Sequence, residues 1–259
     1  MRYKLLIGYD GTEFSGWQIQ PNSPTIQEEI NRVLSLYCRE EIRVIGSGRT
    51  DAGVHATGQV AHFDSEKELT SSALTSLNAM LPRAITIESI EEVSADFHAL
   101  FSAKRKCYSY HIYNGKNPGP FLRRYVTAIW DPIDFEKLKG ASRLFVGEID
   151  FAAFANVCKH RIGKSTVRHL FSIDIEQKGP LITLTFEGKG FLYKMVRNLT
   201  GGMLLVATGK MTLDELKMIL EGKKRTKAIP CADARGLFLR RVDYELAKTS
   251  REESILVPF

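Results

Sequence analysis

The stretch YKLLIGYDG, residues 3–11, has a weak copy of itself near the middle of the chain, YSYHIYNG at residues 108–115. In both, apolar and polar residues alternate over the length of a strand, and the run ends at a DG or NG turn. A helical pattern and further strands follow each copy. The repeat therefore predicts two similar α/β halves, residues 1–103 and 104–259, that meet near residue 104.

Hydrophobic periodicity places the other elements around these two strands. We expect further strands at 42–46, 58–63, 85–93, 167–177, 181–188 and 236–246, and helices at 23–38, 71–81, 134–147 and 193–207. Capping boxes are predicted at two helix starts, Thr25 with Glu28 and Thr212 with Glu215. Strands joined alternately by tight turns and by helices predict an α+β fold with mixed or antiparallel sheets.

The composition is that of a soluble globular protein, with 259 residues, 44% hydrophobic and 25% charged. A net charge of +6 suits a polyanionic partner without requiring one. The longest apolar run, at residues 203–207, is far too short to cross a membrane, and the first residues lack the apolar core of a signal peptide. We therefore expect a cytoplasmic protein with no membrane contact.

Metal and nucleotide cofactors are not indicated. The four cysteines, Cys38, Cys107, Cys158 and Cys231, are too widely spaced for a zinc knuckle or a disulfide framework. The sequence has no HExxH spacing, no GxxxxGK[ST] loop and no GxGxxG that opens a helix.

The segment GSGRTDAGVHATGQVAHF, residues 46–63, contains a candidate reactive carboxylate, Asp51. An aspartate in such a segment is most often a turn residue that caps its own loop. Two features favour a functional role. The loop has more glycine than a hairpin needs, which would let a large ligand approach the backbone, and Arg49 lies beside the carboxylate.

Arg197 is the second candidate, because its neighbours in KMVRNL are apolar and predict a largely buried helix. A buried arginine usually needs a carboxylate partner. That partner is either part of a structural salt bridge or Asp51 itself, whose carboxylate the arginine would keep ionised.

Tyr108 follows a run of basic residues at the start of its strand. Strand tyrosines are usually core or surface residues, but an aromatic ring beside basic residues can also stack on a nucleobase. The basic residues would then contact phosphates, or they form an ordinary solvated face. They are Lys104, Arg105, Lys106, Arg123 and Arg124.

Several blocks of this sequence, in the same order, resemble the tRNA pseudouridine synthase A family. The block GRTDAGVHATGQVAHF at 48–63 resembles its active-site signature, and RTDAGVHA is highly specific. The other matching blocks are YDGTEFSGWQIQP, NAMLP, DFHALFSAKRKCYSYHIYN, FLYKMVRNLTGG and ARGLFL.

The resemblance implies an isomerase that converts uridine to pseudouridine at positions 38–40 of the tRNA anticodon stem-loop, without cofactor or metal. It implies Asp51 as nucleophile toward either the ribose C1′ or the base, with Arg197 holding the carboxylate. Tyr108 would stack on the base and assist proton removal, Arg49 would help extract the uridine, and Leu237 would pack near it. The implied substrate-binding set also includes Lys104, Arg105 and Lys106. The implied fold has two RRM-like (ferredoxin-like) α/β halves that meet at a central cleft. The resemblance also implies that two such chains form a homodimer.

The sequence departs from the family pattern at two places. Asp233 adds a negative charge near Leu237, and Cys107 precedes Tyr108 where a larger or basic residue is usual. Two other functions remain open. A non-catalytic RNA-binding module would not need Asp51, and a glycosidic hydrolase would need a second carboxylate nearby, such as Asp64 or Glu66.

Overall fold

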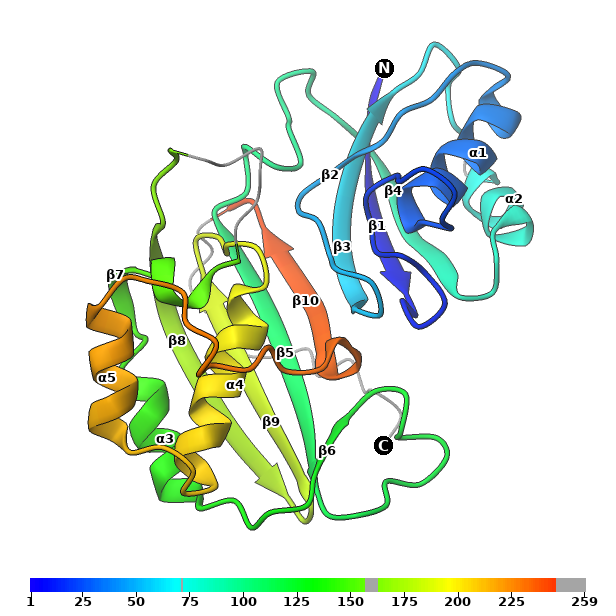
Figure 1. The fold of residues 1–259 in the computed structure, drawn as a ribbon. Helices are drawn as coiled ribbons and strands as arrows, with labels where there is room; N and C mark the ends of the chain where they lie inside the picture. The colour runs from blue at the N-terminus through cyan, green and yellow to red at the C-terminus, as the bar shows by residue number, and fades with distance from the viewer. Residues whose placement is uncertain (71, 157–162, 246–259) are drawn as a thin grey trace.

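The computed structural model describes residues 1–70, 72–156 and 163–245 (Figure 1). Cys158 and the last part of the predicted second half, residues 246–259, lie outside the described residues. The first half contains β1 (Arg2–Tyr9), α1 (Ile26–Cys38), β2 (Ile45–Gly46), β3 (His55–Asp64), α2 (Ala73–Met80) and β4 (Ile85–Val93).

The second half contains more elements in the same underlying order. They are β5 (Arg105–Asn114), β6 (Thr127–Ile129), α3 (Phe135–Arg143), β7 (Gly147–Asp150), η1 (Ala152–Phe154), β8 (Val167–Lys178), β9 (Leu181–Gly188), α4 (Met195–Ala207), α5 (Leu213–Glu221), η3 (Ala234–Gly236) and β10 (Leu237–Asp243). Figure 1 shows α3, α4 and α5 together beside these strands, and α1 and α2 beside the strands of the first half.

The strand order confirms the predicted α+β class. The sheet runs β4-β1-β3-β10-β5-β9-β8-β7, with β2 paired to β3 and β6 paired to β5, and most pairs are antiparallel. The first half has the spatial order fourth, first, third and second strand (β4-β1-β3-β2), and β10-β5-β9-β8 repeats that order in the second half. Both are the β-α-β-β-α-β arrangement of ferredoxin-like folds. The two repeated sequences, in β1 and β5, are the first strands of the two halves. The boundary at residues 103 and 104 falls between β4 and β5, and as a domain boundary it stays a prediction.

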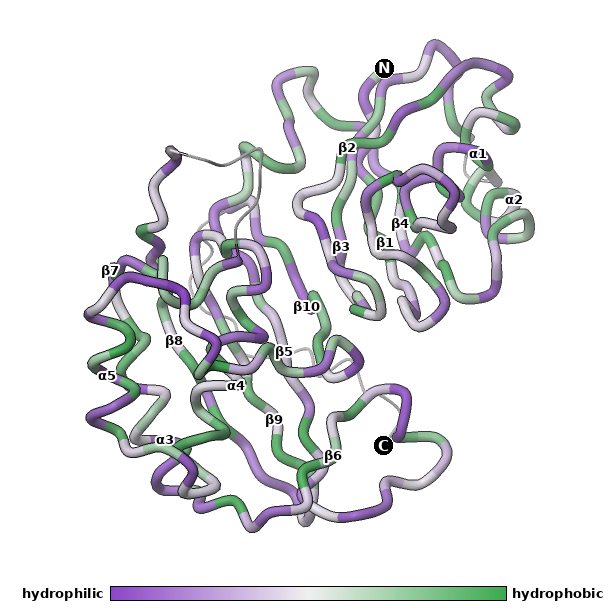
Figure 2. The backbone as a smooth tube through the Cα atoms, viewed as in Figure 1, coloured by the Kyte–Doolittle hydropathy of each residue, from purple (hydrophilic) through white to green (hydrophobic). Residues whose placement is uncertain are grey.

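Alternation along the strands builds the core. Every second residue of β1 and of β9 is buried, as expected for a sheet with one face packed on helices. Hydrophobic residues are spread over strands and helices instead of forming one long stretch (Figure 2). In the described ranges, no helix is long and apolar enough to cross a membrane.

Three local predictions are corrected. The strand expected at 42–46 is only Ile45–Gly46, and β3 starts at His55, inside the predicted loop. The capping box at Thr25 and Glu28 does not form, and the buried Thr25 hydroxyl has no hydrogen-bond partner in the described chain. The preceding loop holds the start of α1 instead, because the amides of Ile26 and Gln27 donate to the backbone carbonyls of Gly16 and Trp17. The other capping box, at the start of α5, is confirmed.

The two halves join where β3 and β10 run in parallel, with His55 paired to Phe238 and Ala56 to Leu239. Gly58 allows this close approach, since a Cβ atom there would lie 2.1 Å from the carbonyl oxygen of Arg240. The glycine therefore serves the contact between the halves.

We expect Gly58→Ala to lower the free energy of unfolding by about 1–3 kcal/mol, the usual cost of overpacking. Urea unfolding followed by circular dichroism measures it. Gly140→Ala is the matched control, because a Cβ there meets nothing within 4 Å and alanine favours the helix by up to about 1 kcal/mol. Equal stability of the two variants would contradict the close packing at the junction.

Candidate active site

Asp51 lies in the loop between β2 and β3, in a tight turn closed by a hydrogen bond from the Val54 amide to the Asp51 carbonyl (3.1 Å). The preceding residue is held from the side, because the Trp17 amide donates to the Thr50 carbonyl (3.1 Å). Gly16 makes this contact possible. Its φ is +94°, and a Cβ atom at this position would lie only 2.5 Å from the Thr50 carbonyl oxygen. The carboxylate is therefore presented from a fixed backbone.

Contacts or backbone conformation within the protein account for each of the four glycines of the 46–63 segment. Gly46 packs on the Trp17 ring, and Gly48 lies against the Lys106 ammonium. Gly53 has a φ of +75°, and Gly58 faces β10. Clearance for a ligand, the reading favoured by the sequence, is not needed to account for them.

The ion pair expected between Asp51 and Arg197 is present and connects the two halves. The Arg197 Nη1 atom donates to Asp51 Oδ2 at 2.7 Å, and both side chains are largely buried, 13% and 19% exposed. The guanidinium is itself held, because its Nε donates to the Ala232 carbonyl at 2.7 Å. No hydrogen bond to the other carboxylate oxygen, Oδ1, occurs in the described residues, so one oxygen is anchored and the other is available.

Tyr108, in β5, is buried and its ring meets the edge of Phe191, with ring centres 5.0 Å apart. Burial, followed by smaller effects of Tyr9 and the Asp51 charge, raises the pKa of the Tyr108 hydroxyl far above its usual range. The hydroxyl is thus neutral at physiological pH, and the described residues offer it no hydrogen bond. Leu237 is the first residue of β10 and is buried. It lies two residues before Leu239, which is the direct strand partner of Tyr108.

We expect Tyr108→Phe to react about tenfold to a hundredfold faster than Tyr108→Leu at saturating RNA. The phenyl ring keeps the contact with Phe191 and the aromatic face, whereas leucine loses stacking of roughly 1–3 kcal/mol. Single-turnover rates of both variants measure it. Equal rates would exclude the ring as a stacking platform, and full activity of Tyr108→Phe would exclude an essential hydroxyl.

The predicted basic residues do not form one exposed cluster. Arg49 and Lys104 are exposed. Arg105 pairs with Glu187, its Nη1 lying 3.0 Å from Oε2. Lys106 is buried at 8% exposure, and its ammonium donates to the Ser47 carbonyl beside the Asp51 loop. Lys106 therefore does not belong to a solvated face, because it supports the loop from within.

Neither extra carboxylate lies near Asp51. Asp64 is at the far end of β3 from the Asp51 loop, about 30 Å away at the usual rise per strand residue, and it pairs with Arg2. Glu66 is exposed beyond that end. Neither of them can therefore serve as the second acid of the hydrolase alternative. The charge of Asp233 is offset locally by Arg235, with Oδ2 and Nε 3.0 Å apart.

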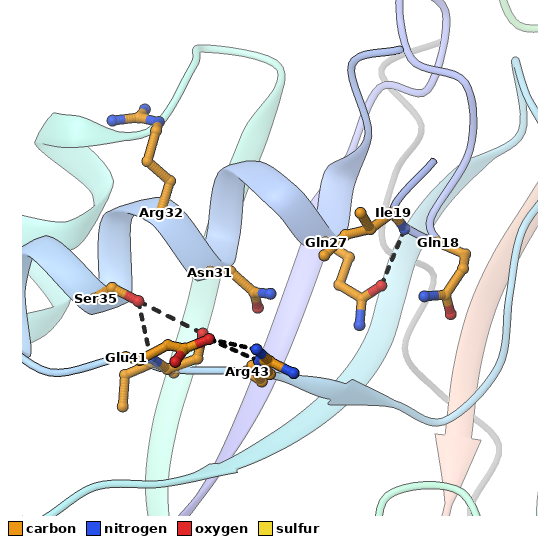
Figure 3. A pocket seen from close by; sticks show the side chains of 9 residues that line it. Gln18, Ile19, Gln27, Asn31, Arg32, Ser35, Glu41 and Arg43 are labelled. Carbon is orange, nitrogen blue, oxygen red and sulfur yellow. Dashed lines mark hydrogen bonds and ion pairs between the residues drawn. The ribbon is translucent and has the colours of Figure 1, made fainter. Parts of the chain in front are cut away.

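A pocket of about 540 Å³ lies along α1 and the segment after it, and it contains none of the candidate residues (Figure 3). Its amide side chains are used within the protein: Gln27 accepts from the Ile19 amide and Asn31 from the Val44 amide. In the described part of the chain, no three histidine, cysteine, aspartate or glutamate side chains gather to hold a metal.

Four residues around Asp51 were not predicted as part of a site. They are Tyr9, Asp10, His55 and Tyr125, which contact one another or the Asp51 loop. Their sequence signals were weak, since Tyr9 and Asp10 read as a strand end with its turn and His55 belongs to no metal-binding spacing.

Comparison with known proteins gives a consistent result. A sequence model of the family described as tRNA pseudouridine synthase matches residues 6–102 and 141–245. The tRNA pseudouridine synthase A 1 of Protochlamydia amoebophila is 47% identical over 94% of this chain and 96% of that protein. The tRNA pseudouridine synthase A of Listeria monocytogenes is 42% identical over 94% and 99%. A chain from the crystal structure of a Cbf5-Nop10-Gar1 complex is 13% identical with a TM-score of 0.33, over 78% of this chain and 53% of that one, a likeness too weak to specify a topology.

Proposed function

This chain belongs to the tRNA pseudouridine synthase family of isomerases, and from that premise we propose that it acts on the anticodon stem-loop, at tRNA positions 38–40, with Asp51 as nucleophile. The observation that carries the proposal is the Asp51–Arg197 pair. One carboxylate oxygen is anchored at 2.7 Å by an arginine from the other half, and the second oxygen is left available to react. A turn aspartate that only caps its own loop would not need this partner.

The reaction rearranges one bond without a net change in composition. The N1–C1′ bond of the uridine breaks, a C5–C1′ bond forms, and the C5 proton is lost while N1 gains one. The Asp51 carboxylate would attack C1′ or the base, so that one difficult step becomes two easier ones. Arg197 keeps the Asp51 carboxylate oriented, and its own position is fixed by the Ala232 carbonyl.

Access to the uridine requires extracting it from the stacked stem, at a cost of a few kcal/mol. The exposed Arg49, two residues before Asp51, is suited to entering the helix and replacing the base. Tyr108 and Leu237 would then hold the flipped base between an aromatic ring and an apolar side chain. Tyr108 assists proton removal from C5 in this proposal.

Basic residues would position the RNA through its phosphates. Lys104 is exposed and free to do so, and Arg105 shares its guanidinium with Glu187. Lys106 would act indirectly, because its ammonium is directed at the Ser47 carbonyl of the Asp51 loop. The net charge of +6 favours the association in general.

We expect the purified chain, incubated with an unmodified tRNA transcript that carries uridines at 38–40, to form pseudouridine there. Chemical mapping of pseudouridine by reverse transcription locates the product, and the reaction should proceed in EDTA. A transcript with cytidines at these three positions is the control. Pseudouridine elsewhere would refute the position, and tight binding without product on any tRNA would favour an RNA-binding module.

The homodimer and the cytoplasmic location that the resemblance implies remain predictions. Light scattering of the purified chain tests the first. A mass of one chain, rather than two, would contradict it.

A further inference from the structure

The end of β1 contacts the Asp51 loop on both sides of the carboxylate. The Tyr9 hydroxyl lies 2.8 Å from the Thr50 hydroxyl, directly before Asp51. Asp10 reaches the other side, with Oδ1 3.1 Å from Nδ1 of His55, four residues after Asp51. Tyr9, the last residue of β1, and Asp10, which follows it, therefore contact the two ends of the loop.

His55 is enclosed by residues of the second half. It is 1% exposed, its ring is stacked on Phe238 with centres 4.6 Å apart, and the Tyr125 ring meets its edge at 5.1 Å. It is also one of the residues through which β3 pairs with β10. The imidazole thus lies where the two halves meet.

Tyr125 completes a connection from the second half to the end of β1. Its hydroxyl donates to Asp10 Oδ2 at 2.8 Å. Burial alone would raise the pKa of the Asp10 carboxyl, but its contact with His55 and the hydrogen bonds from Thr12 and Tyr125 outweigh burial and lower that pKa well below its usual range. Asp10 therefore stays charged, and a hydrogen bond to a charged acceptor is stronger than one to a neutral acceptor.

The imidazole is bound on one side only. Its Nδ1 atom accepts from the Gly11 amide at 3.1 Å, and its Nε2 atom is buried without a hydrogen-bond partner among the residues that the structure describes. An apolar side chain of similar size would avoid the cost of the unpaired Nε2 but would leave the buried Gly11 amide unpaired. The imidazole therefore ties the first residue of β3 to the segment that follows β1.

We propose that Asp10, His55 and Tyr125 form a loop clamp, a set of positioning residues that keeps Asp51 aligned with Arg197 and Tyr108 across the junction of the halves. The inference rests on the proposed role of Asp51. It goes beyond that role because none of the three would touch the uridine. Asp51 belongs to one half and Arg197 and Tyr108 to the other, so a shift at the junction displaces the nucleophile from its partners. A misplacement of about 1 Å can cost a hundredfold in rate.

The test is Tyr125→Phe, which removes the hydroxyl that bonds Asp10 and keeps the ring against His55. We expect the single-turnover rate at saturating tRNA to fall about tenfold to a hundredfold. The KM for tRNA and the unfolding temperature should stay close to wild type. Tyr3→Phe is the matched control, because it removes a hydrogen-bonded hydroxyl of β1 that lies within the first half and should leave the rate unchanged.

A second variant tests whether the contact itself matters. Asp10→Asn removes the charge, and combining it with Tyr125→Phe should slow the reaction by less than the product of the two separate effects. Should Asp10→Asn fail to fold, Tyr125→Phe alone decides. A wild-type rate in Tyr125→Phe, or a loss seen only in KM or in unfolding temperature, would overturn the clamp.

Asp51→Asn is assayed in parallel to separate the two proposals. An inactive Asp51→Asn beside a fully active Tyr125→Phe would reject the clamp and leave the nucleophile in place. An active Asp51→Asn would reject the proposed function, and the clamp with it. If both variants are impaired, and Tyr125→Phe lowers the rate while its KM stays close to wild type, the nucleophile and the clamp are both supported.

Discussion

Asp51→Asn is expected to abolish pseudouridine formation while tRNA binding and folding remain nearly intact. The amide has the shape of the carboxylate, so its oxygen can still accept a hydrogen bond from Arg197 at the distance seen for Oδ2. It lacks the negative charge that makes the second oxygen a nucleophile. Loss of a nucleophile in a covalent mechanism lowers the rate by at least about 10⁴-fold.

Two assays on the same preparation make this test decisive. Filter binding gives the tRNA affinity, and mapping of the RNA after long incubation gives the product. Asp64→Asn is the matched control, because it changes an exposed carboxylate at the other end of β3 and should leave activity unchanged. A near wild-type rate in Asp51→Asn would show that this residue is not the nucleophile. Loss of binding together with loss of product would indicate a structural role instead.

The sequence predicted the two halves because a repeated strand leaves a repeated pattern. Alternation and the DG and NG turns identify β1 and β5 from residues that are close together in the chain. Their matching positions in the sheet follow from the same β-α-β-β-α-β order. The pairing of β10 with β3 had no such repeated pattern in the sequence. This parallel contact involves only two residue pairs, and it depends on Gly58.

Capping shows where local patterns stop being sufficient. Thr212 forms its capping box with Glu215, whereas Thr25, with the same spacing to Glu28, forms none. The loop before α1 holds the start of this helix, because the amides of Ile26 and Gln27 donate to the carbonyls of Gly16 and Trp17. A motif with the correct spacing can therefore be unused where contacts from another segment fix the start of the helix.

The site was predictable to the extent that charge must be compensated. A buried arginine requires a carboxylate, which related Arg197 to Asp51 across 146 positions of the chain. The same reasoning missed Lys106, because lysine is rarely buried and the exposed reading is usually correct. It also missed Tyr125, whose bond to Asp10 spans 115 positions and joins two residue types that are ordinary on a surface.

Arg197→Gln is expected to lower the single-turnover rate about 10²-fold to 10³-fold, the usual effect of removing one preorganised charged donor from a site. The guanidinium now anchors one oxygen of Asp51 and is fixed by the Ala232 carbonyl, so the nucleophile has one orientation. Without it, a largely buried carboxylate lacks its counter-charge and is free to rotate. The affinity for tRNA should change little, because Arg197 is directed at Asp51.

Arg2→Gln is the matched control for loss of an arginine. Arg2 also pairs with a carboxylate, that of Asp64, and donates to a backbone carbonyl, that of Phe97, but it is remote from Asp51. It should lower stability without changing the rate at saturating tRNA. Arg197→Lys should fall between wild type and Arg197→Gln, since an ammonium keeps the charge but lacks the planar geometry with which the guanidinium bonds both the Asp51 carboxylate and the Ala232 carbonyl. If Arg197→Gln reacted within about threefold of wild type, the pair would be a structural salt bridge, because a donor that orients the nucleophile costs far more to remove.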